Sequence, residues 1–171
     1  METIPGGPLF VSRVTQGKGR HDAPNQYGAW YCSRDPASAV AETIRFFRRS
    51  VLEDRDFENP DGAVRALVGL SLDDALDLVD LDDPLELAAR RLRPSQVATG
   101  QRAVTQGIAR SIFDEGAAGF LWWSTLEGGW TNVTLFHERA LPHISIVARP
   151  KRLSIRLPEV KEAAERIGVR I

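Results

Sequence analysis

Four residues are spaced along the chain in a way that suggests shared chemistry. Tyr31 lies 11 residues after Arg20, Glu42 lies 11 residues after Tyr31, and Ser124 ends a Trp-Trp-Ser run far downstream. A carboxylate can stabilise the oxocarbenium-like ribose that forms when nicotinamide leaves a dinucleotide. A guanidinium can grip the phosphates, and an aromatic ring can support the nicotinamide. These are the residue types needed to hold NAD and break its nicotinamide–ribose bond.

Two further residues, Asn132 and Arg13, extend this set. Ser124 and Asn132 can orient ribose or amide groups through hydrogen bonds. Arg13 lies in a predicted strand, Leu9–Val14, and points the same way as Leu9 and Val11. Such an arginine either extends from a strand end to solvent or lines a cleft, and the sequence leaves both readings open.

Glu42 is predicted to lie on a helix that Asp35 caps and Pro36 begins. Val40 and Ile44 belong to the apolar stripe of this helix, and Glu42 falls at the border of that stripe. The plain structural alternative is a surface glutamate paired with Arg45 at i,i+3, worth a few tenths of a kcal/mol. The tyrosine and the arginine that precede Glu42 favour the functional reading.

The remaining hydrophobic periodicity predicts an α+β fold, because strands and helices do not alternate regularly. Strands are expected at Leu9–Val14, Gly28–Ser33, Val64–Leu72, Leu78–Leu81, Phe120–Trp123, Trp130–Phe136, Ile144–Ala148 and Leu153–Ile155. Besides the helix after Asp35, helices are expected from Pro84, over Thr99–Glu115 and over Pro158–Ile167.

Composition points to an ordinary globular protein. The 171 residues, 43% hydrophobic and 26% charged, are expected to form a single domain spanning 1–171. A net charge of −1 and a pI near 6.3 argue against direct nucleic-acid binding. The cluster of Trp122, Trp123 and Trp130 is therefore expected in the core. A single cysteine, Cys32, excludes an internal disulfide and fits a reducing compartment.

Several common sites are not supported by the sequence. The three histidines lack metal-ligand spacing, so no metal site is expected. Neither a phosphate-binding P-loop, nor a Rossmann glycine motif, nor a hydrolase elbow around Ser124 is present. The N-terminus does not resemble a signal peptide, and no stretch approaches the ~20 apolar residues of a membrane helix. We expect a cytoplasmic location and no membrane association.

From about Leu9 to Phe136, the sequence resembles a known family, the RES domains. The first half of the resemblance rests on the runs Gly19–Pro24, Trp30–Pro36 and Ala39–Thr43. The second half rests on Ala98-Thr99, Thr105-Gln106, Gly119–Ser124, and Asn132 before Leu135-Phe136. Two departures stand out. His21-Asp22 occurs where many members have Trp-Asn or Phe-Asp, and Ser12 occurs where an aromatic residue is common.

The resemblance implies a fold similar to ADP-ribosyltransferases, with mixed sheets and flanking helices. RES domains are toxins of bacterial toxin–antitoxin pairs that consume NAD. Arg20, Tyr31, Glu42 and Ser124 match the positions that the family uses, and Arg13 matches a further arginine. The implied partner is a cognate Xre-type helix-turn-helix antitoxin. NAD is then a substrate, and no metal is implied.

The sequence therefore predicts an enzyme that cleaves the nicotinamide–ribose bond of NAD by hydrolysis or phosphorolysis. One alternative is a protein ADP-ribosyltransferase with the same site, because water, phosphate and a protein side chain all remain open as acceptors. Another is a non-enzymatic binding module on the same fold. Whether the chain forms homo-oligomers is also left open.

Overall fold

The computed structural model describes Pro5 and residues 7–171 of the chain. They form two compact units. The first unit comprises the described residues up to Cys32, with Leu72–Trp123 and Val133–Ser145. The second unit comprises Ser33–Ser71, Ser124–Asn132 and Ile146–Ile171. The expectation of a single domain stays a prediction.

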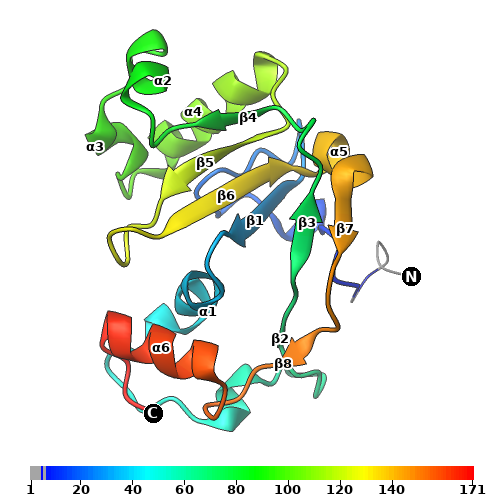
Figure 1. Cartoon of the computed structure of the whole chain (residues 1–171), viewed down its shortest axis with the longest axis vertical. Helices are drawn as coiled ribbons and strands as arrows, with labels where there is room; N and C mark the ends of the chain where they lie inside the picture. Colours follow the sequence, from blue (N-terminus) through cyan, green and yellow to red (C-terminus); the bar gives the residue numbers. More distant parts are fainter. Residues whose placement is uncertain (1–4, 6) are drawn as a thin grey trace. The chain divides into compact units, whose positions relative to one another are not determined.

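The main sheet has four strands in the order β1-β6-β5-β4, with β6 between β1 and β5 (Figure 1). These strands are β1 (Ala29–Ser33), β4 (Leu78–Asp80), β5 (Gly119–Trp123) and β6 (Thr131–Phe136). Strands β4 and β5 are parallel, with Val79 opposite Phe120. Four residues of β5 and five of β6 are buried. For β5 this matches a near-continuous apolar sequence, whereas β6 also buries the polar Asn132 and Thr134.

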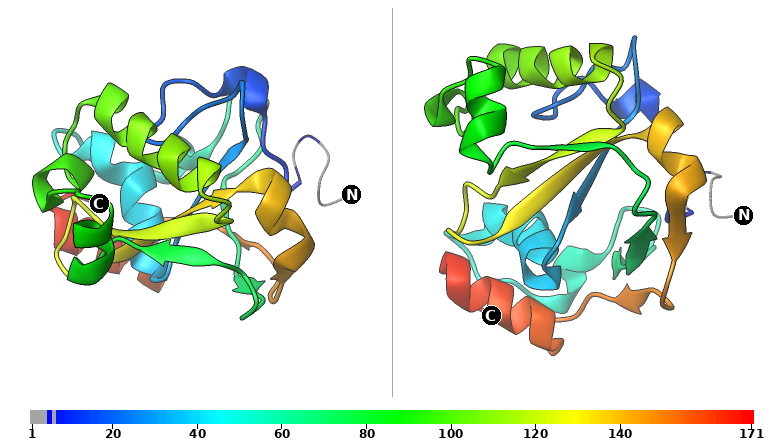
Figure 2. Two further views of the ribbon diagram at one scale, coloured as in Figure 1. Left: turned by 90° about the horizontal axis from the view of Figure 1, so that it is seen from above. Right: turned by 45° about the horizontal axis from the view of Figure 1, so that its top comes forward.

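Helices of the first unit pack on this sheet. They are α2 (Pro84–Ala89), α3 (Pro94–Val97) and α4 (Arg102–Asp114), and α4 runs alongside β5 (Figure 2). The apolar face of α4, with Ile108, Ala109 and Ile112, is buried in one cluster with Phe120 and Trp122 of β5. The helical spacing of these apolar residues is what directs that face to the core.

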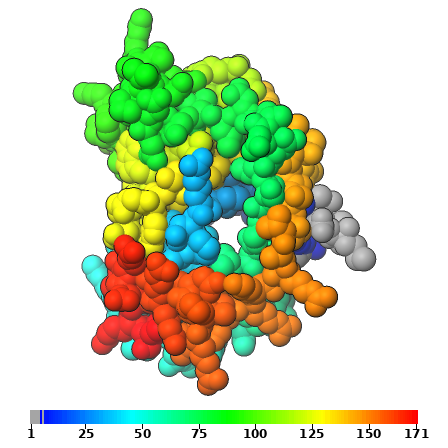
Figure 3. Space-filling view, in the orientation of Figure 1, coloured from blue at the N-terminus to red at the C-terminus, as the bar shows by residue number. Residues whose placement is uncertain are grey.

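In the second unit, α1 (Pro36–Ile44) packs against α6 (Pro158–Ile167). Asp35 caps α1 by accepting a hydrogen bond from the Ser38 N–H at 3.0 Å. Val40 and Ile44 of α1 and Val160 and Ala164 of α6 are buried in a shared apolar cluster. The polar side of α6 faces solvent, and the helix lies along one face of this unit in Figure 3.

The other elements are short. They are the 3-10 helices at Arg13–Thr15 (η1), Arg45–Phe47 (η2), Asp54–Phe57 (η3) and Leu141–His143 (η4), the helix α5 (His137–Ala140), and the strands β2 (Ala66–Leu67), β3 (Leu70–Leu72), β7 (Ile144–Ile146) and β8 (Lys151–Arg152). β2 pairs with β8 in antiparallel fashion, and β3 pairs with β7. In the described part of the chain, no helix has the length and apolar character of a membrane span.

The predicted α+β class is confirmed, as are the helices that begin at Pro36, Pro84 and Pro158. The predicted strand Val64–Leu72 is two short strands, and the predicted helix Thr99–Glu115 begins only at Arg102. The predicted strand Leu153–Ile155 is wrong, because Lys151 and Arg152 form the ladder instead. Leu157 N–H then donates to the Ser154 carbonyl at 3.0 Å, which turns the chain into α6.

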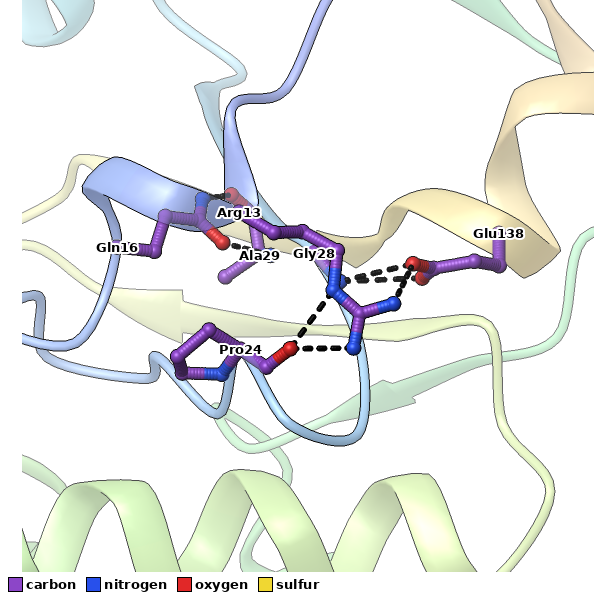
Figure 4. Close-up of polar contacts among 6 residues, drawn as sticks. All are labelled: Arg13, Gln16, Pro24, Gly28, Ala29 and Glu138. Atoms are coloured by element: carbon purple, nitrogen blue, oxygen red, sulfur yellow. Dashed lines mark hydrogen bonds and ion pairs between the residues drawn. The ribbon is translucent and has the colours of Figure 1, made fainter.

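The predicted strand Leu9–Val14 is also wrong. The chain forms η1 instead, and the edge of β1 is completed by a side chain. The amide of Gln16 donates to the Ala29 carbonyl at 2.5 Å and accepts from the Ala29 N–H at 3.0 Å, as a neighbouring strand would (Figure 4). Because the Gln16 amide satisfies both the N–H and the carbonyl of Ala29 at the edge of β1, these groups need no neighbouring strand as a partner.

We expect opposite effects from the same substitution at two glycines of the first unit. A Cβ at Gly119 would lie 2.4 Å from the Thr134 carbonyl oxygen, whereas a Cβ at Gly107 on α4 would meet nothing within 4 Å. Gly119→Ala should destabilise the protein by about 2 kcal/mol or more, because backbone on the adjacent strand must move. Gly107→Ala should stabilise it by about 0.5–1 kcal/mol through helix propensity. Urea unfolding measures both, and equal effects would contradict the packing of β5 on β6.

Candidate functional site

Tyr31 projects from β1 in the first unit, and its hydroxyl is held on two sides. It donates to Asp22 Oδ1 at 2.6 Å and accepts from the His21 backbone N–H at 2.9 Å. Burial raises the pKa of the hydroxyl, and the hydrogen bond to Asp22 raises that pKa further, so the phenol stays protonated. The residue as a whole is 41% exposed. Its polar end is thus fixed, while part of the side chain remains open to a ligand.

Asp22 closes the loop that carries Arg20. Its second oxygen accepts from the N–H groups of Gly17 and Gly19, each at 2.7 Å. A Cβ at Gly19 would lie 2.4 Å from Asp22 Oδ1 and 2.6 Å from the Tyr31 hydroxyl, so only glycine fits. The polar loop predicted from sequence is therefore tightly ordered around one carboxylate.

Arg20 is anchored by backbone carbonyls at the end of α3 and just after it. One guanidinium nitrogen donates to the carbonyls of Val97 at 3.0 Å and Thr99 at 2.7 Å. The guanidinium also lies over the Trp122 ring, 5.3 Å from its centre. The Arg20 carbonyl accepts from the Thr105 hydroxyl. Thr99 and Thr105, which contribute to the family resemblance, thus hold Arg20 and its loop in place.

His21 lies beneath this loop, only 2% exposed. Its Nδ1 is 2.8 Å from the hydroxyl of Thr134, which also accepts from the Trp122 indole N–H at 3.1 Å. Burial, with a smaller effect from nearby Arg20, holds the pKa of His21 well below its usual value. The imidazole is therefore neutral, and it serves as a buried support for Arg20 and Tyr31.

Arg13 makes a separate set of contacts in the first unit (Figure 4). Its Nε donates to the Pro24 carbonyl at 2.8 Å, and one terminal nitrogen contacts Glu138 at 3.2 Å. Glu138 in turn accepts from the Gly28 N–H. These contacts tie η1 and α5 to the 24–28 segment. A role for Arg13 in NAD binding stays a prediction.

Glu42 lies on α1 in the second unit, and both of its carboxylate oxygens have partners. Oε1 accepts from Asn132 Nδ2 at 3.3 Å, and Oε2 pairs with Arg45 at 3.3 Å. The i,i+3 pair weighed from the sequence is thus present, and a second donor lies on the other side. The Glu42 side chain is 30% exposed, so the carboxylate is oriented by protein groups and still accessible.

Asn132 and Ser124 are both buried in the second unit, at 1% and 5% exposure. Asn132 lies near the start of β6 and contacts Glu42 directly. Ser124 lies at the turn after β5, where its hydroxyl accepts from the Leu126 N–H at 3.1 Å and its N–H donates to the Trp130 carbonyl at 2.7 Å. The structure thus brings Glu42 and Asn132 together and gives Ser124 a turn-forming role. Its catalytic role stays a prediction.

Sequence reasoning missed the supporting roles of Asp22, Ser33 and Ser38. Ser38, Glu42 and Arg45 follow one another at i, i+4 and i+7, so helical periodicity could have placed them on one face. Ser33 contacts Asn132, 99 residues away, and so leaves no local signal. Asp22 contacts Gly17, Gly19 and Tyr31, which are close to it in sequence. Burial raises the pKa of the Cys32 thiol to about 11, which leaves the thiol protonated and unreactive. Among the described residues, no His, Cys, Asp or Glu cluster could hold a metal.

Comparisons with known proteins identify the family. The family profile described as RES domain matches residues 7–156. Among solved structures, the chain is similar to one described as the crystal structure of the M. tuberculosis MbcT-MbcA toxin–antitoxin complex. That match has a TM-score of 0.62 and 18% sequence identity, and covers 88% of this chain and 76% of the other. At this identity the likeness shows the shared fold. No curated protein matches the sequence.

The buried histidine generates a prediction for stability. Because the pKa of His21 is lowered in the folded state, the unfolded chain binds a proton below about pH 6.5 that the folded protein does not. The free energy of unfolding should therefore fall as pH drops below about 6.5, by up to about 1.4 kcal/mol per pH unit from this residue. Urea unfolding across this range should show the loss, and His21→Gln should remove it. The half-exposed His143 offers the control His143→Gln, which should retain it.

Proposed function

The chain belongs to the RES domain family, and from this premise we propose that it is a toxin that breaks the nicotinamide–ribose bond of NAD. The observation that carries the proposal is Glu42, a partly exposed carboxylate held between the Asn132 amide and Arg45. A carboxylate fixed in this way is suited to face a cation that develops on ribose, because its orientation requires no rearrangement as charge appears.

The reaction can be written without a cofactor. The bond between ribose C1′ and the nicotinamide ring nitrogen breaks, and its electron pair leaves with the nitrogen, which loses its positive charge. Positive charge then spreads over C1′ and the ring oxygen of the ribose, where Glu42 would stabilise it. An acceptor oxygen bonds to C1′ and gives up a proton if it comes from water. Phosphate as acceptor would give the 1″-phosphate of ADP-ribose, and a protein side chain would give an ADP-ribosylated protein.

Arg20 and Tyr31 are proposed to hold the dinucleotide. Arg20 is a planar donor suited to phosphate, and it lies at a loop that Asp22 keeps in one conformation. Tyr31 offers an aromatic surface for nicotinamide, since its hydroxyl is already held by Asp22 and His21. Ser124 and Arg13 are proposed as further contacts, as the family resemblance implies.

A partner is part of the proposal, because a cytoplasmic enzyme that destroys NAD must be restrained. The similar solved structure is described as a toxin–antitoxin complex, which supports a cognate antitoxin for this chain as well. The resemblance implies an antitoxin of the Xre-type helix-turn-helix class. We propose a cytoplasmic location, consistent with the single free thiol at Cys32.

Replacing Glu42 with Gln tests the proposed chemistry. The change keeps size and helix propensity but removes the negative charge, so NAD turnover should fall about a hundredfold or more while folding is little changed. The matched control is Glu165→Gln on the exposed side of α6 in the same unit. Products should be identified with and without phosphate and with a protein acceptor. A well-folded wild-type protein that leaves NAD intact would instead favour a binding module.

Antitoxin and NAD should exclude each other if the antitoxin restrains the toxin by covering Glu42 or Arg20. The Glu42→Gln protein permits the measurement, because it should bind NAD without consuming it. Calorimetry should show that antitoxin raises the apparent dissociation constant of NAD, and that NAD raises that of the antitoxin by the same factor. Independent binding of the two would mean that the antitoxin restrains the toxin without covering Glu42 or Arg20.

Co-expression with the antitoxin should restore the growth and cellular NAD that this chain alone depletes.

A further inference from the structure

The structure buries Asn132 in surroundings that do not fit its predicted role. From the sequence it was expected to contact NAD, yet it is only 1% exposed. Its side chain forms hydrogen bonds with Ser33, Ser38 and Glu42, which are all residues of the second unit. A side chain this buried has almost no surface to offer a dinucleotide. Its amide must therefore act on another part of the protein.

The direction of the amide is determined by its neighbours. Oδ1 accepts from the Ser33 hydroxyl at 2.6 Å and from the Ser38 hydroxyl at 3.1 Å. With the carbonyl oxygen committed to these two donors, the NH2 group faces Glu42 Oε1 at 3.3 Å. The reversed amide would place an acceptor oxygen against a carboxylate oxygen, which is repulsive. The acceptor-only Glu42 carboxylate thus selects the orientation in which Asn132 donates to it, and the hydroxyls of Ser33 and Ser38 hold that orientation by donating to Oδ1.

This network supports Glu42 from its buried side. Ser38 precedes Glu42 by one helical turn on α1, Ser33 ends β1, and Asn132 lies on β6. The two partners of the carboxylate differ in kind. The Arg45 side chain is 35% exposed, so solvent screens its ion pair with Glu42. Asn132, in contrast, is buried and held in one conformation. The neutral amide fixes the carboxylate without cancelling its charge.

We infer that Asn132, oriented by Ser33 and Ser38, is a positioning residue that sets the direction in which Glu42 presents its carboxylate to the substrate. The inference rests on the proposed NAD-cleaving function. It reassigns Asn132 from ligand contact to a support that acts through Glu42. Its effect should therefore appear in the chemical step and depend on the charge of Glu42.

The test compares Asn132→Asp with wild type. The substituted side chain has the same shape, but when ionised it cannot donate to Glu42 and it places a second negative charge beside it. We expect kcat for NAD cleavage to fall about ten- to a hundredfold with little change in KM. Activity should recover as pH is lowered, because the protonated acid regains a donor. Asn59→Asp at an exposed position of the same unit is the matched control and should behave as wild type.

A double substitution separates positioning from a general structural effect. In a Glu42→Gln background, Asn132→Asp should cause little further loss of turnover, because its effect acts through the charge of Glu42. An equal loss in both backgrounds, or a raised KM with unchanged kcat, would overturn the inference. Ser38→Ala is a milder variant that removes one of the two donors that orient the amide, and it should give a smaller loss of the same kind.

Failure of the inference can be told from failure of the proposed function. Wild-type protein that does not consume NAD would refute the function, whereas normal kcat in a folded Asn132→Asp protein that retains wild-type KM would refute only the inference.

A spectroscopic measurement tests the contact between Asn132 and Glu42 without measuring NAD turnover. The side-chain NH2 resonances of Asn132 should shift in Glu42→Gln and stay in place in Glu165→Gln. Unchanged resonances in both proteins would overturn the proposed positioning contact.

Discussion

Two buried polar side chains on β6, Asn132 and Thr134, impose the constraint on which the candidate residues of each unit depend. Each is at most 1% exposed. A buried polar group left without a partner costs about 1–3 kcal/mol, so the surrounding sequence must supply donors and acceptors for both. Thr134 is satisfied within the first unit and Asn132 within the second. Their partners are His21 and Trp122 for Thr134, and Ser33, Ser38 and Glu42 for Asn132.

Hydrogen bonds from surrounding protein groups therefore hold the proposed reactive side chains in place. Tyr31 is held by Asp22 and by the backbone next to Arg20, and Glu42 is held by Asn132. Tyr31 is held at its hydroxyl and Glu42 at its carboxylate, and both side chains remain partly exposed. Groups that are oriented before the substrate binds need little reorganisation in the transition state, which is the physical basis of electrostatic catalysis.

The His21-Asp22 departure from the common RES sequence has a structural reason in the first unit. His21 stands where many members have an aromatic residue, and its ring packs edge-on against Phe120 and Trp122 at 4.8 and 5.0 Å. It thus keeps the flat shape of an aromatic side chain while it contacts Thr134 through a hydrogen bond. Asp22 supplies two oxygens that accept three hydrogen bonds, enough to close the Gly17–Gly19 turn and hold Tyr31.

The amino-acid sequence by itself determined the local elements and the identity of the family. Asp35-Pro36 marks the start of α1 because a capping carboxylate and a fixed proline φ act within one helical turn. Apolar periodicity likewise placed α6 and β6 correctly. Motif order and spacing placed Glu42, Tyr31 and Arg20 in one family pattern. Each of these signals acts between residues that are close in sequence.

Only the tertiary structure decided what those residues touch. Asn132 could be read as a ligand contact because its sequence does not reveal that Ser33 and Ser38, 99 and 94 residues away, occupy its carbonyl. The segment Leu9–Val14 looked like a strand because alternation predicts a pleat, but the Gln16 amide completes the edge of β1 instead. Partners of this kind are selected by packing, since the energy of a long-range hydrogen bond depends on where the fold places its donor and acceptor.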